Sequence, residues 1–310
     1  VTDSRRVIPG SLFFAFPGAR SDGNEFVNEA IERGAAGIVT SEDHLEHGTV
    51  ASLRVSDARL ALARFARRYH GWPDHTLRVA GVTGTNGKTT VTGLTRHLME
   101  RSGRPVGLVG TVRYHLGDRE VPSFKTTPES ADLYAMLRSM LAAGCAEAVM
   151  EVSSHGIHQS RVAGLNLEVT AFLNLSRDHL DYHGTMEEYF SEKRAIFNGA
   201  NGSLPKVAVV NGDCPYGQRL VQEIPTGVRG LTFGENLGND FRVHEISLSS
   251  DGSEFVLDCP AGSLVVRSPM LGRYNVMNVA ASLAIVHALG FSVSKVAHKV
   301  GTFKGVDGRM

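Results

Sequence analysis

The chain has 310 residues, 42% of them hydrophobic, which is enough for two domains with buried cores. Its 32 lysines and arginines balance 32 aspartates and glutamates, so charge gives no reason to expect nucleic acid or an acidic membrane as a partner. The three cysteines are widely spaced, no apolar run approaches the roughly 20 residues that span a bilayer, and no charged-then-apolar leader opens the chain. We therefore expect a cytoplasmic protein with free thiols and no membrane insertion.

Residues 1–76 are predicted to form a small N-terminal α/β domain. A Pro9-Gly10 turn precedes an apolar run typical of a buried strand, and Gly34 closes the helical pattern that follows. Ser56 is the expected N-cap of a second helix, and residues 71–74 are the expected linker to the rest of the chain. The predicted elements are a strand over 11–16, a helix over 24–33, a strand over 37–40 and a helix over 57–69.

Residues 77–310 alternate strands with helices, which predicts a central domain with a mostly parallel sheet and crossover helices. Thr185-Met186-Glu187-Glu188 matches a capping box at the start of a helix. Between residues 240 and 267, two strand-like runs flank a Ser-Asp-Gly turn, which predicts an antiparallel region at the sheet edge. Predicted strands cover 77–82, 106–109, 146–152, 169–173 and 206–211, and predicted helices cover 89–101, 127–143, 185–197, 274–289 and 294–300.

A phosphate-binding loop of the P-loop type is predicted over residues 81–90, Gly-Val-Thr-Gly-Thr-Asn-Gly-Lys-Thr-Thr, between a strand and a helix. Glycines let backbone N–H groups turn toward phosphate oxygens, and the helix N-terminus adds unpaired N–H groups. Lys88 would reach the β- and γ-phosphates, and the hydroxyl of Thr89 or Thr90 would bind Mg²⁺. The sequence departs from the pattern GxxxxGK[ST] at Val82, where glycine is usual. The alternative is a plain glycine turn between a strand and a helix.

Two further polar clusters follow predicted strands. Glu151-Val152-Ser153-Ser154-His155 ends one strand, and residues 174–183 after another are dense in Asn, Asp and His. Because ligands bind at the carboxyl ends of parallel strands, both clusters are expected beside the phosphate loop. A carboxylate at Glu151 could hold Mg²⁺ there.

Each of these residues also has an ordinary structural interpretation, which the sequence leaves open. Glu151 could be a plain strand-end carboxylate, and His179 a loop histidine bonded to the backbone. Lys193 falls within a predicted helix, where a lone lysine is usually solvated. Caps or turn formers are the alternative for Asp178, Asp181 and His183.

A series of motifs resembles the Mur ligase family over the whole length of the chain. Within the family the chain most resembles the MurE subfamily, ligases that add the third peptide residue to UDP-N-acetylmuramoyl-L-alanyl-D-glutamate (UDP-MurNAc-L-Ala-D-Glu) in peptidoglycan precursor synthesis. The matching segments are 3–5, 9–13, 84–90, Thr126-Thr127-Pro128-Glu129, 151–155, 174–186, 272–281 and 305–310.

The resemblance implies ATP and Mg²⁺ as cofactors. Lys88, Glu151, His179 and Lys193 would be catalytic, with Lys193 carbamylated, because carbamylation turns a cation into a carboxylate that suits a metal. One Mg²⁺ would be held by Thr89 and Glu151, and the second by His179 and Lys193. The residues implied to bind ATP are Gly84, Thr85, Asn86, Gly87, Lys88, Thr89, Thr90, Asn275, Asn278 and Arg309.

The resemblance also implies an acceptor site and a reaction. ATP would phosphorylate the D-glutamyl carboxylate, and an amino group of a diamino acid would displace phosphate from the acyl phosphate. The expected diamino acid is meso-diaminopimelate, with lysine as the alternative, and a monomer is expected. Residues implied to bind the UDP part are Ser4, Gly18, Ala19 and Arg20, and those for the muramoyl-dipeptide are Thr126, Thr127, Ser154, Gln159 and Arg161.

The chain stops at Met310, where the C-terminal, amino-acid-binding domain of the family is expected to begin. We therefore expect a truncated chain that ligates weakly or not at all. Another Mur-type ligase, such as folylpolyglutamate synthase or the ligase half of cyanophycin synthetase, is an alternative that the Asp3-Ser4-Arg5 motif disfavours. A non-catalytic binding or scaffold protein is an alternative of another class, which the presence of Lys88, Glu151, His179 and Lys193 disfavours.

Overall fold

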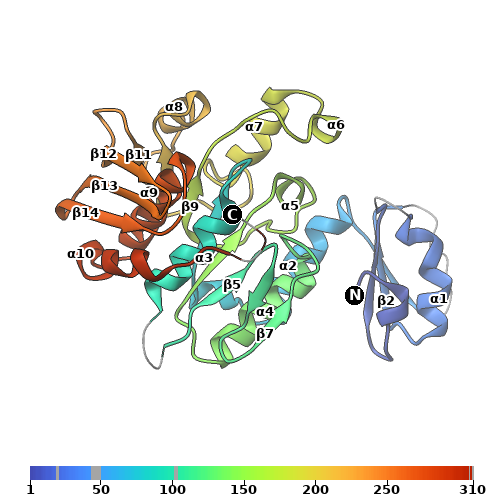
Figure 1. Ribbon diagram of the computed structural model, residues 1–310. Coiled ribbons are helices and arrows are strands. Elements are labelled where there is room, and N and C mark those ends of the chain that lie inside the picture. The colour runs from blue at the N-terminus through green and yellow to red at the C-terminus, as the bar shows by residue number, and fades with distance from the viewer. Residues whose placement is uncertain (19–20, 43–49, 101–103, 307, 309–310) are drawn as a thin grey trace.

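The computed structural model describes residues 1–18, 21–42, 50–100, 104–306 and 308, which contain two β-sheets. The smaller sheet has three parallel strands in the order β1-β2-β3 and stands apart from the larger one (Figure 1). The domain boundary at residue 76 stays a prediction. The elements of this part are η1 (Ser4–Arg6), β1 (Leu12–Ala15), η2 (Gly23–Phe26), α1 (Val27–Glu32), β2 (Gly37–Thr40) and β3 (Ala51–Arg54), and the next helix, α2 (Ala58–Tyr69), packs on α4 (Ser130–Ala142) of the larger part.

The larger sheet has eleven strands in the order β14-β13-β12-β11-β10-β9-β4-β8-β5-β6-β7. Neighbouring strands from β12 to β5 pair in parallel. The predicted mostly parallel sheet with an antiparallel edge is confirmed, and β6 and β7 add a second antiparallel edge. The strands are β4 (Arg78–Thr83), β5 (Gly107–Val109), β6 (Arg113–His115), β7 (Glu120–Pro122), β8 (Glu147–Glu151), β9 (Leu167–Phe172), β10 (Val207–Asn211), β11 (Arg229–Gly234), β12 (Phe241–Ser249), β13 (Gly252–Cys259) and β14 (Gly262–Ser268).

Helices cover both faces of this sheet, and side chains of the central strands alternate between two cores. In β10, Val207 and Val209 join the core under α3 and α9, whereas Ala208 and Val210 join the core under α4, α7 and α8. Both faces are buried, so these strands are continuous apolar runs in the sequence. The helices are η3 (Pro73–His75), α3 (Lys88–Met99), α4 (Ser130–Ala142), α5 (Ser154–His158), α6 (Leu180–His183), α7 (Met186–Arg194), α8 (Pro215–Gln222), α9 (Arg273–Ala288), α10 (Val293–Val296) and η4 (Ala297–Thr302).

Two predicted helix starts have different outcomes. The N-cap of α2 is Asp57 rather than Ser56, because the Asp57 carboxylate accepts hydrogen bonds from the backbone N–H groups of Arg59 and Leu60. The capping box of α7 is confirmed, with the Thr185 hydroxyl and the Glu188 carboxylate each accepting the other residue's backbone N–H.

The expected linker at residues 71–74 is anchored by a buried ion pair. The Asp74 side chain is fully buried and accepts hydrogen bonds from the Asn166 backbone N–H at 2.8 Å and from Arg67, whose Nη2 lies 2.8 Å from Oδ2. The end of α2 is thereby fixed to the segment before β9.

Replacing Asp74 with alanine is expected to lower the free energy of unfolding by about 2–4 kcal/mol, because Arg67 and the Asn166 N–H lose a buried acceptor. Urea unfolding followed by circular dichroism measures the change. Asp118→Ala, at an exposed aspartate, is the matched control. Equal stability of the two variants would show that the ion pair does not anchor this segment.

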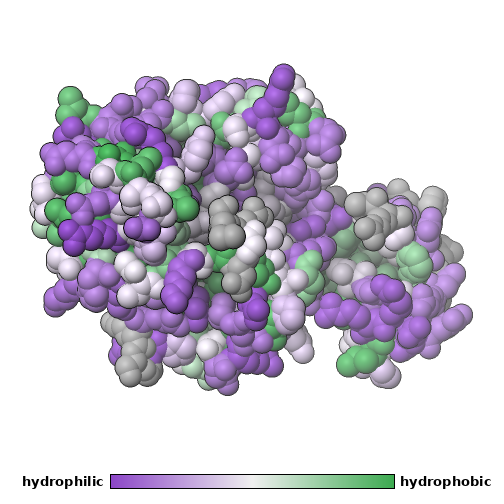
Figure 2. All heavy atoms as spheres, in the orientation of Figure 1, coloured by the Kyte–Doolittle hydropathy of each residue, from purple (hydrophilic) through white to green (hydrophobic). Residues whose placement is uncertain are grey.

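Hydrophilic side chains cover most of the face shown in Figure 2, with hydrophobic ones scattered among them. Such scattered apolar residues are usual on protein surfaces. Within the described residues, the helices are all too short or too polar to cross a bilayer.

Candidate active site

The candidate site lies where three neighbouring parallel strands end. β4 lies between β9 and β8, so the carboxyl ends of the three strands are side by side. β4 leads into the predicted phosphate loop, β8 ends at Glu151, and β9 ends two residues before Asn174. The sheet thus brings the three predicted clusters to one edge, as expected for parallel strands.

The segment between β4 and α3 has the backbone of an anion-binding loop. Gly87, the N-cap of α3, has φ +89°, and no side chain caps the helix, so the N–H groups of its first turn are open to a ligand. A Cβ at Gly87 would lie 2.5 Å from Asn278 Oδ1, so the close approach of α9 requires glycine there. Asn174 fixes the loop, because its amide exchanges hydrogen bonds with the backbone N–H and carbonyl of Asn86.

Lys88 is held over this loop. Its ammonium donates to the carbonyl oxygens of Gly84 at 2.7 Å and Thr85 at 2.8 Å. A lysine at the start of a helix whose N–H groups are uncapped adds a full positive charge to the partial charge of the helix end. This arrangement favours a phosphate ligand over a plain strand–helix turn.

Glu151 is buried beside the loop, with 1% of its surface exposed. Its carboxylate accepts hydrogen bonds from the Thr89 hydroxyl at 3.2 Å and from Thr111, through the backbone N–H at 2.7 Å and the hydroxyl at 2.9 Å. These donors among the described residues are all uncharged. A buried carboxylate of this kind suits a cation, and Mg²⁺ typically takes one or two carboxylates plus substrate phosphates. Within the described residues no cluster of three or more His, Cys, Asp or Glu side chains could hold a metal by itself.

A cavity of about 760 Å³ unites the loop with most of the other predicted residues. A second cavity of about 720 Å³ adjoins the loop and shares Asn86, Gly87, Tyr274 and Asn278 with the first. The predicted residues that line the first cavity are Thr85, Asn86, Gly87, Lys88, Thr89, Thr90, Thr126, Thr127, Glu151, Arg161, His179, Asn275 and Asn278.

The residues predicted to bind the acceptor are connected by hydrogen bonds to the backbone of Glu151. The buried Thr127 hydroxyl donates to the Glu151 carbonyl at 3.0 Å, and Arg161 Nη1 donates to the Thr127 carbonyl at 2.9 Å. Arg161 Nε lies 3.0 Å from Glu129 Oε1, and Gln159 accepts a hydrogen bond from the same guanidinium. Arg161 is therefore preorganised at the cavity wall by neighbours on both sides.

Lys193 is 1% exposed, so the solvated interpretation of this lysine is wrong. Its ammonium donates to the Gly84 carbonyl at 3.2 Å and lies 4.5 Å from the centroid of the Tyr189 ring. Burial, reinforced by the charge of Lys88, holds the pKa of Lys193 well below its usual range. The neutral amine that this favours is the form that reacts with carbon dioxide. His179 packs on the same Tyr189 ring, with the ring centroids 6.2 Å apart.

Comparison with known proteins decides the family. The family model described as "Mur ligase middle domain" matches residues 82–286, and that described as "Mur ligase family, catalytic domain" matches residues 1–70. The chain belongs to the Mur ligase family. The resemblance drawn from its motifs is therefore confirmed.

Several relatives of this Mur ligase chain carry one name, UDP-N-acetylmuramoyl-L-alanyl-D-glutamate–2,6-diaminopimelate ligase. The proteins of that name from Solibacter usitatus and Geobacillus kaustophilus are 40% and 42% identical over 99% of this chain, which spans 62% and 63% of their lengths. A solved structure of a ligase of that name is 30% identical with a TM-score of 0.88, over 100% of this chain and 63% of its own. MurF from Acinetobacter baumannii is 26% identical with a TM-score of 0.73 over the same shares.

Ser153, rather than the predicted Ser154, faces the cavity of this Mur ligase. Ser153 lines the cavity and caps α5 through its hydroxyl oxygen, which lies 3.1 Å from the Thr127 hydroxyl oxygen. Ser154 is 2% exposed, and its hydroxyl pairs with His183 Nε2 at 2.9 Å. Ser153 is the N-cap and has an extended backbone, whereas Ser154 is the first residue of α5. Ser154 does not line this cavity, and its substrate role stays a prediction.

The alternatives left open for the loop after β9 are settled in part. Asp178 accepts the His179 backbone N–H at 2.9 Å and so acts as a turn former, although it also lines the cavity. Asp181 lies exposed in α6. Burial, with the nearby His155 ring adding to it, lowers the pKa of His183 to about 4, so this imidazole is neutral at pH 7. His183 is a structural partner of Ser154, stacked on Tyr189.

The residues predicted to bind the UDP part are not among those that line this cavity. Ser4 is buried in the smaller part, where its hydroxyl donates to Glu29 at 2.8 Å, and the Gly18 N–H donates to the Ser21 carbonyl. The predicted Ala19, Arg20 and Arg309 lie outside the described residues. Their roles stay predictions.

Sequence reasoning missed several residues that line the cavity. Ser153 and His155 lie within the predicted carboxylate cluster and Tyr274 within a matching segment, but no role was assigned to them. Thr111, Lys125 and Leu271 stand outside all of these motifs, and their strand-end loops were the only available signal.

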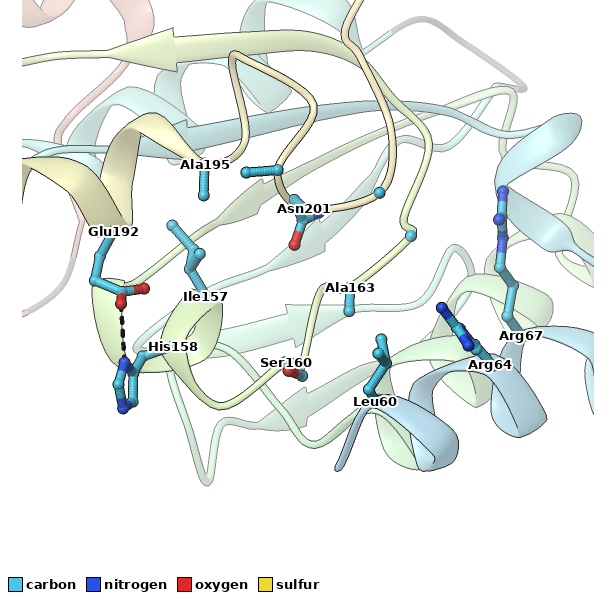
Figure 3. Close-up of a pocket in the computed structure, with 13 residues that line it drawn as sticks. Leu60, Arg64, Arg67, Ile157, His158, Ser160, Ala163, Glu192, Ala195 and Asn201 are labelled. Carbon is cyan, nitrogen blue, oxygen red and sulfur yellow. Dashed lines mark hydrogen bonds and ion pairs between the residues drawn. The ribbon is translucent and has the colours of Figure 1, made fainter. Parts of the chain in front are cut away.

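Another cavity, of about 470 Å³, lies between α2, α5 and the segment after α7 (Figure 3). His158 and Glu192 pair at one side of it, with Nδ1 and Oε1 2.9 Å apart. Arg67 at its margin is already paired with Asp74. Residues of the candidate site do not line it.

Proposed function

We propose that this chain provides the nucleotide and acceptor sites of an ATP-dependent amide ligase that adds the third residue to UDP-MurNAc-L-Ala-D-Glu. We further propose meso-diaminopimelate as the amino acid added, because several relatives carry this acceptor and 2,6-diaminopimelate in their names. The enzyme would act as a cytoplasmic monomer in peptidoglycan precursor synthesis. Residues 1–76 would bind the UDP part and residues 77–310 the nucleotide.

The single observation that carries this proposal is the convergence on one cavity of Lys88, Glu151, Thr127 and Arg161. The uncapped helix start and Lys88 suit the phosphates of ATP. The guanidinium of Arg161, held by the Thr127 carbonyl, Glu129 and Gln159, places a permanent positive charge at the cavity wall that suits a carboxylate. The cavity therefore holds donors for a triphosphate and for an acid within one open cleft.

These residues would position a phosphoryl transfer followed by an acyl transfer. Lys88 and the loop N–H groups would hold the β- and γ-phosphates, while Thr127, Ser153 and Arg161 would hold the muramoyl-dipeptide with its D-glutamyl carboxylate toward the γ-phosphorus. Transfer of the γ-phosphoryl group gives an acyl phosphate and ADP. The attacking amine then forms the amide bond and releases phosphate.

Mg²⁺ would be held by Thr89 and Glu151, and a second ion by His179 and a carbamylated Lys193. When bound, these ions would stabilise the charge on the phosphoryl oxygens. Asn275 and Asn278 would contact the base or ribose, since Asn278 lies between the two cavities beside the loop and donates to Asn275 at 3.0 Å.

Thermal unfolding of the chain with each ligand tests the proposal. A ligand that binds only the folded state at 100 times its Kd adds about 2.7 kcal/mol of stability. ATP with Mg²⁺ and UDP-MurNAc-L-Ala-D-Glu should each raise the midpoint. UDP-MurNAc-L-Ala, which lacks the glutamate, should stabilise less. Equal stabilisation by the two muramoyl ligands would favour a sibling ligase, and no stabilisation by ATP would reject the proposal.

Ser153→Ala is expected to weaken binding of UDP-MurNAc-L-Ala-D-Glu about three- to tenfold, since one neutral hydrogen bond is worth about 0.5–1.5 kcal/mol. Ser154→Ala should leave that affinity unchanged to within about twofold and lower stability instead, because His183 loses its partner. Isothermal titration calorimetry measures both variants. The reverse order of effects would restore the role predicted for Ser154.

A further inference from the structure

Thr111, in the segment between β5 and β6, binds both oxygens of the Glu151 carboxylate. Its backbone N–H donates to Oε1 at 2.7 Å and its hydroxyl donates to Oε2 at 2.9 Å. The preceding Gly110 permits this approach, since a Cβ there would lie 2.7 Å from Oε1. One residue far from Glu151 in sequence therefore fixes the orientation of the carboxylate.

The Thr111 hydroxyl also has a second neighbour, Thr126 Oγ1, at 3.1 Å. A hydroxyl carries one hydrogen, and that of Thr111 is directed to Glu151, so Thr126 must be the donor in the second contact. The hydrogen bonds thus run in one direction, from Thr126 to Thr111 to Glu151. Aligned hydrogen bonds of this kind polarise and strengthen one another.

The chain of hydrogen bonds joins two parts of the candidate site. At one end Thr89, the second residue of α3, donates to the same Oε2 of Glu151 at 3.2 Å. At the other end Thr126 and Thr127 line the cavity beside Arg161. Thr111 is the link between the phosphate loop and the segment proposed to bind the acceptor.

We propose that Thr111 is a positioning residue that fixes Glu151 for Mg²⁺ and couples it to the acceptor-binding segment at Thr126. This inference rests on the proposed function, which supplies both ligands. An acceptor oxygen that takes the hydrogen of Thr126 removes the donor from Thr111 and so changes the hydrogen bonding of Glu151. Acceptor binding then alters the Mg²⁺ concentration that nucleotide binding requires. Thr111 itself does not act on the reacting atoms.

The test compares Thr111→Ser with Thr111→Ala, variants that differ only in the hydroxyl oxygen. The readout is the Mg²⁺ concentration that gives half-maximal binding of a fluorescent ATP analogue to the chain. A hydrogen bond to a carboxylate is worth about 1.5–3 kcal/mol, so the alanine variant should require about ten- to a hundredfold more Mg²⁺ than the serine variant. The serine variant should stay within about threefold of the native chain.

Thr170→Val is the matched control, because the Thr170 hydroxyl is buried and has no hydrogen-bond partner among the described residues. This variant should keep the native Mg²⁺ requirement. Addition of UDP-MurNAc-L-Ala-D-Glu should shift the requirement in the native chain and in Thr111→Ser, but not in Thr111→Ala. Equal Mg²⁺ requirements for the serine and alanine variants overturn the inference.

Unfolding midpoints measured without ligands show whether each variant folds. If Thr111→Ala does not fold, Thr126→Val removes the first donor in the same series of hydrogen bonds. If UDP-MurNAc-L-Ala-D-Glu still shifts the Mg²⁺ requirement of Thr126→Val, the inference is overturned. Lack of Mg²⁺-dependent nucleotide binding in the native chain contradicts the proposed function instead. The two failures are therefore distinguishable.

Discussion

Replacement of Lys88 with alanine is expected to weaken ATP binding about a hundredfold or more. Lys88 carries the positive charge at the start of α3, and its ammonium is held over the phosphate loop by the Gly84 and Thr85 carbonyls. Loss of a charged donor to phosphate in a partly buried site costs about 2–5 kcal/mol, because the phosphate charge remains without its partner. This range corresponds to about thirtyfold to several thousandfold in Kd.

Isothermal titration calorimetry with ATP and Mg²⁺ measures the loss. Lys206→Ala is the control, since Lys206 forms a surface ion pair with Glu168 away from the cavity and should keep the native affinity. Native affinity in Lys88→Ala would mean that the loop between β4 and α3 does not bind the triphosphate.

Replacement of Lys193 with methionine is expected to stabilise the chain at neutral pH by about 1–3 kcal/mol in buffer free of carbon dioxide. Burial of the Lys193 amine lowers the stability of the folded chain, because the amine must lose either its proton or its hydration. An apolar side chain of similar length removes that cost. The pKa of Lys193 in the folded chain lies well below 10.5, so the unfolded chain binds more protons. The contribution of Lys193 to the free energy of unfolding therefore rises with pH up to about 10.5.

The difference between Lys193→Met and the native chain should accordingly shrink as the pH rises from neutral toward 10.5. Urea unfolding at several pH values measures this slope. Addition of ¹³C-labelled bicarbonate should give a carbamate signal by nuclear magnetic resonance in the native chain and none in the methionine variant. A difference that grows with pH would contradict the lowered pKa, and a missing carbamate signal would contradict the predicted modification.

The strands and helices that were found from sequence share a strong local signal. The loop between β4 and α3 follows from its glycines and lysine, and α7 from its capping box. Three of the strands that were missed lack such a signal. All four residues of β3 are exposed, and β6 and β7 are three residues long, so neither gives a periodic apolar pattern.

Sequence by itself determined the phosphate loop, the carboxylate at the end of β8 and membership of the Mur ligase family, because these depend on residues close together in the chain. The tertiary structure alone decided that Ser153 rather than Ser154 faces the cavity, that Lys193 is buried, and that Thr111 reaches Glu151 across 40 residues. Packing of distant segments sets these features. Neither hydrophobic periodicity nor a capping motif encodes which side chains meet when strands far apart in sequence become neighbours.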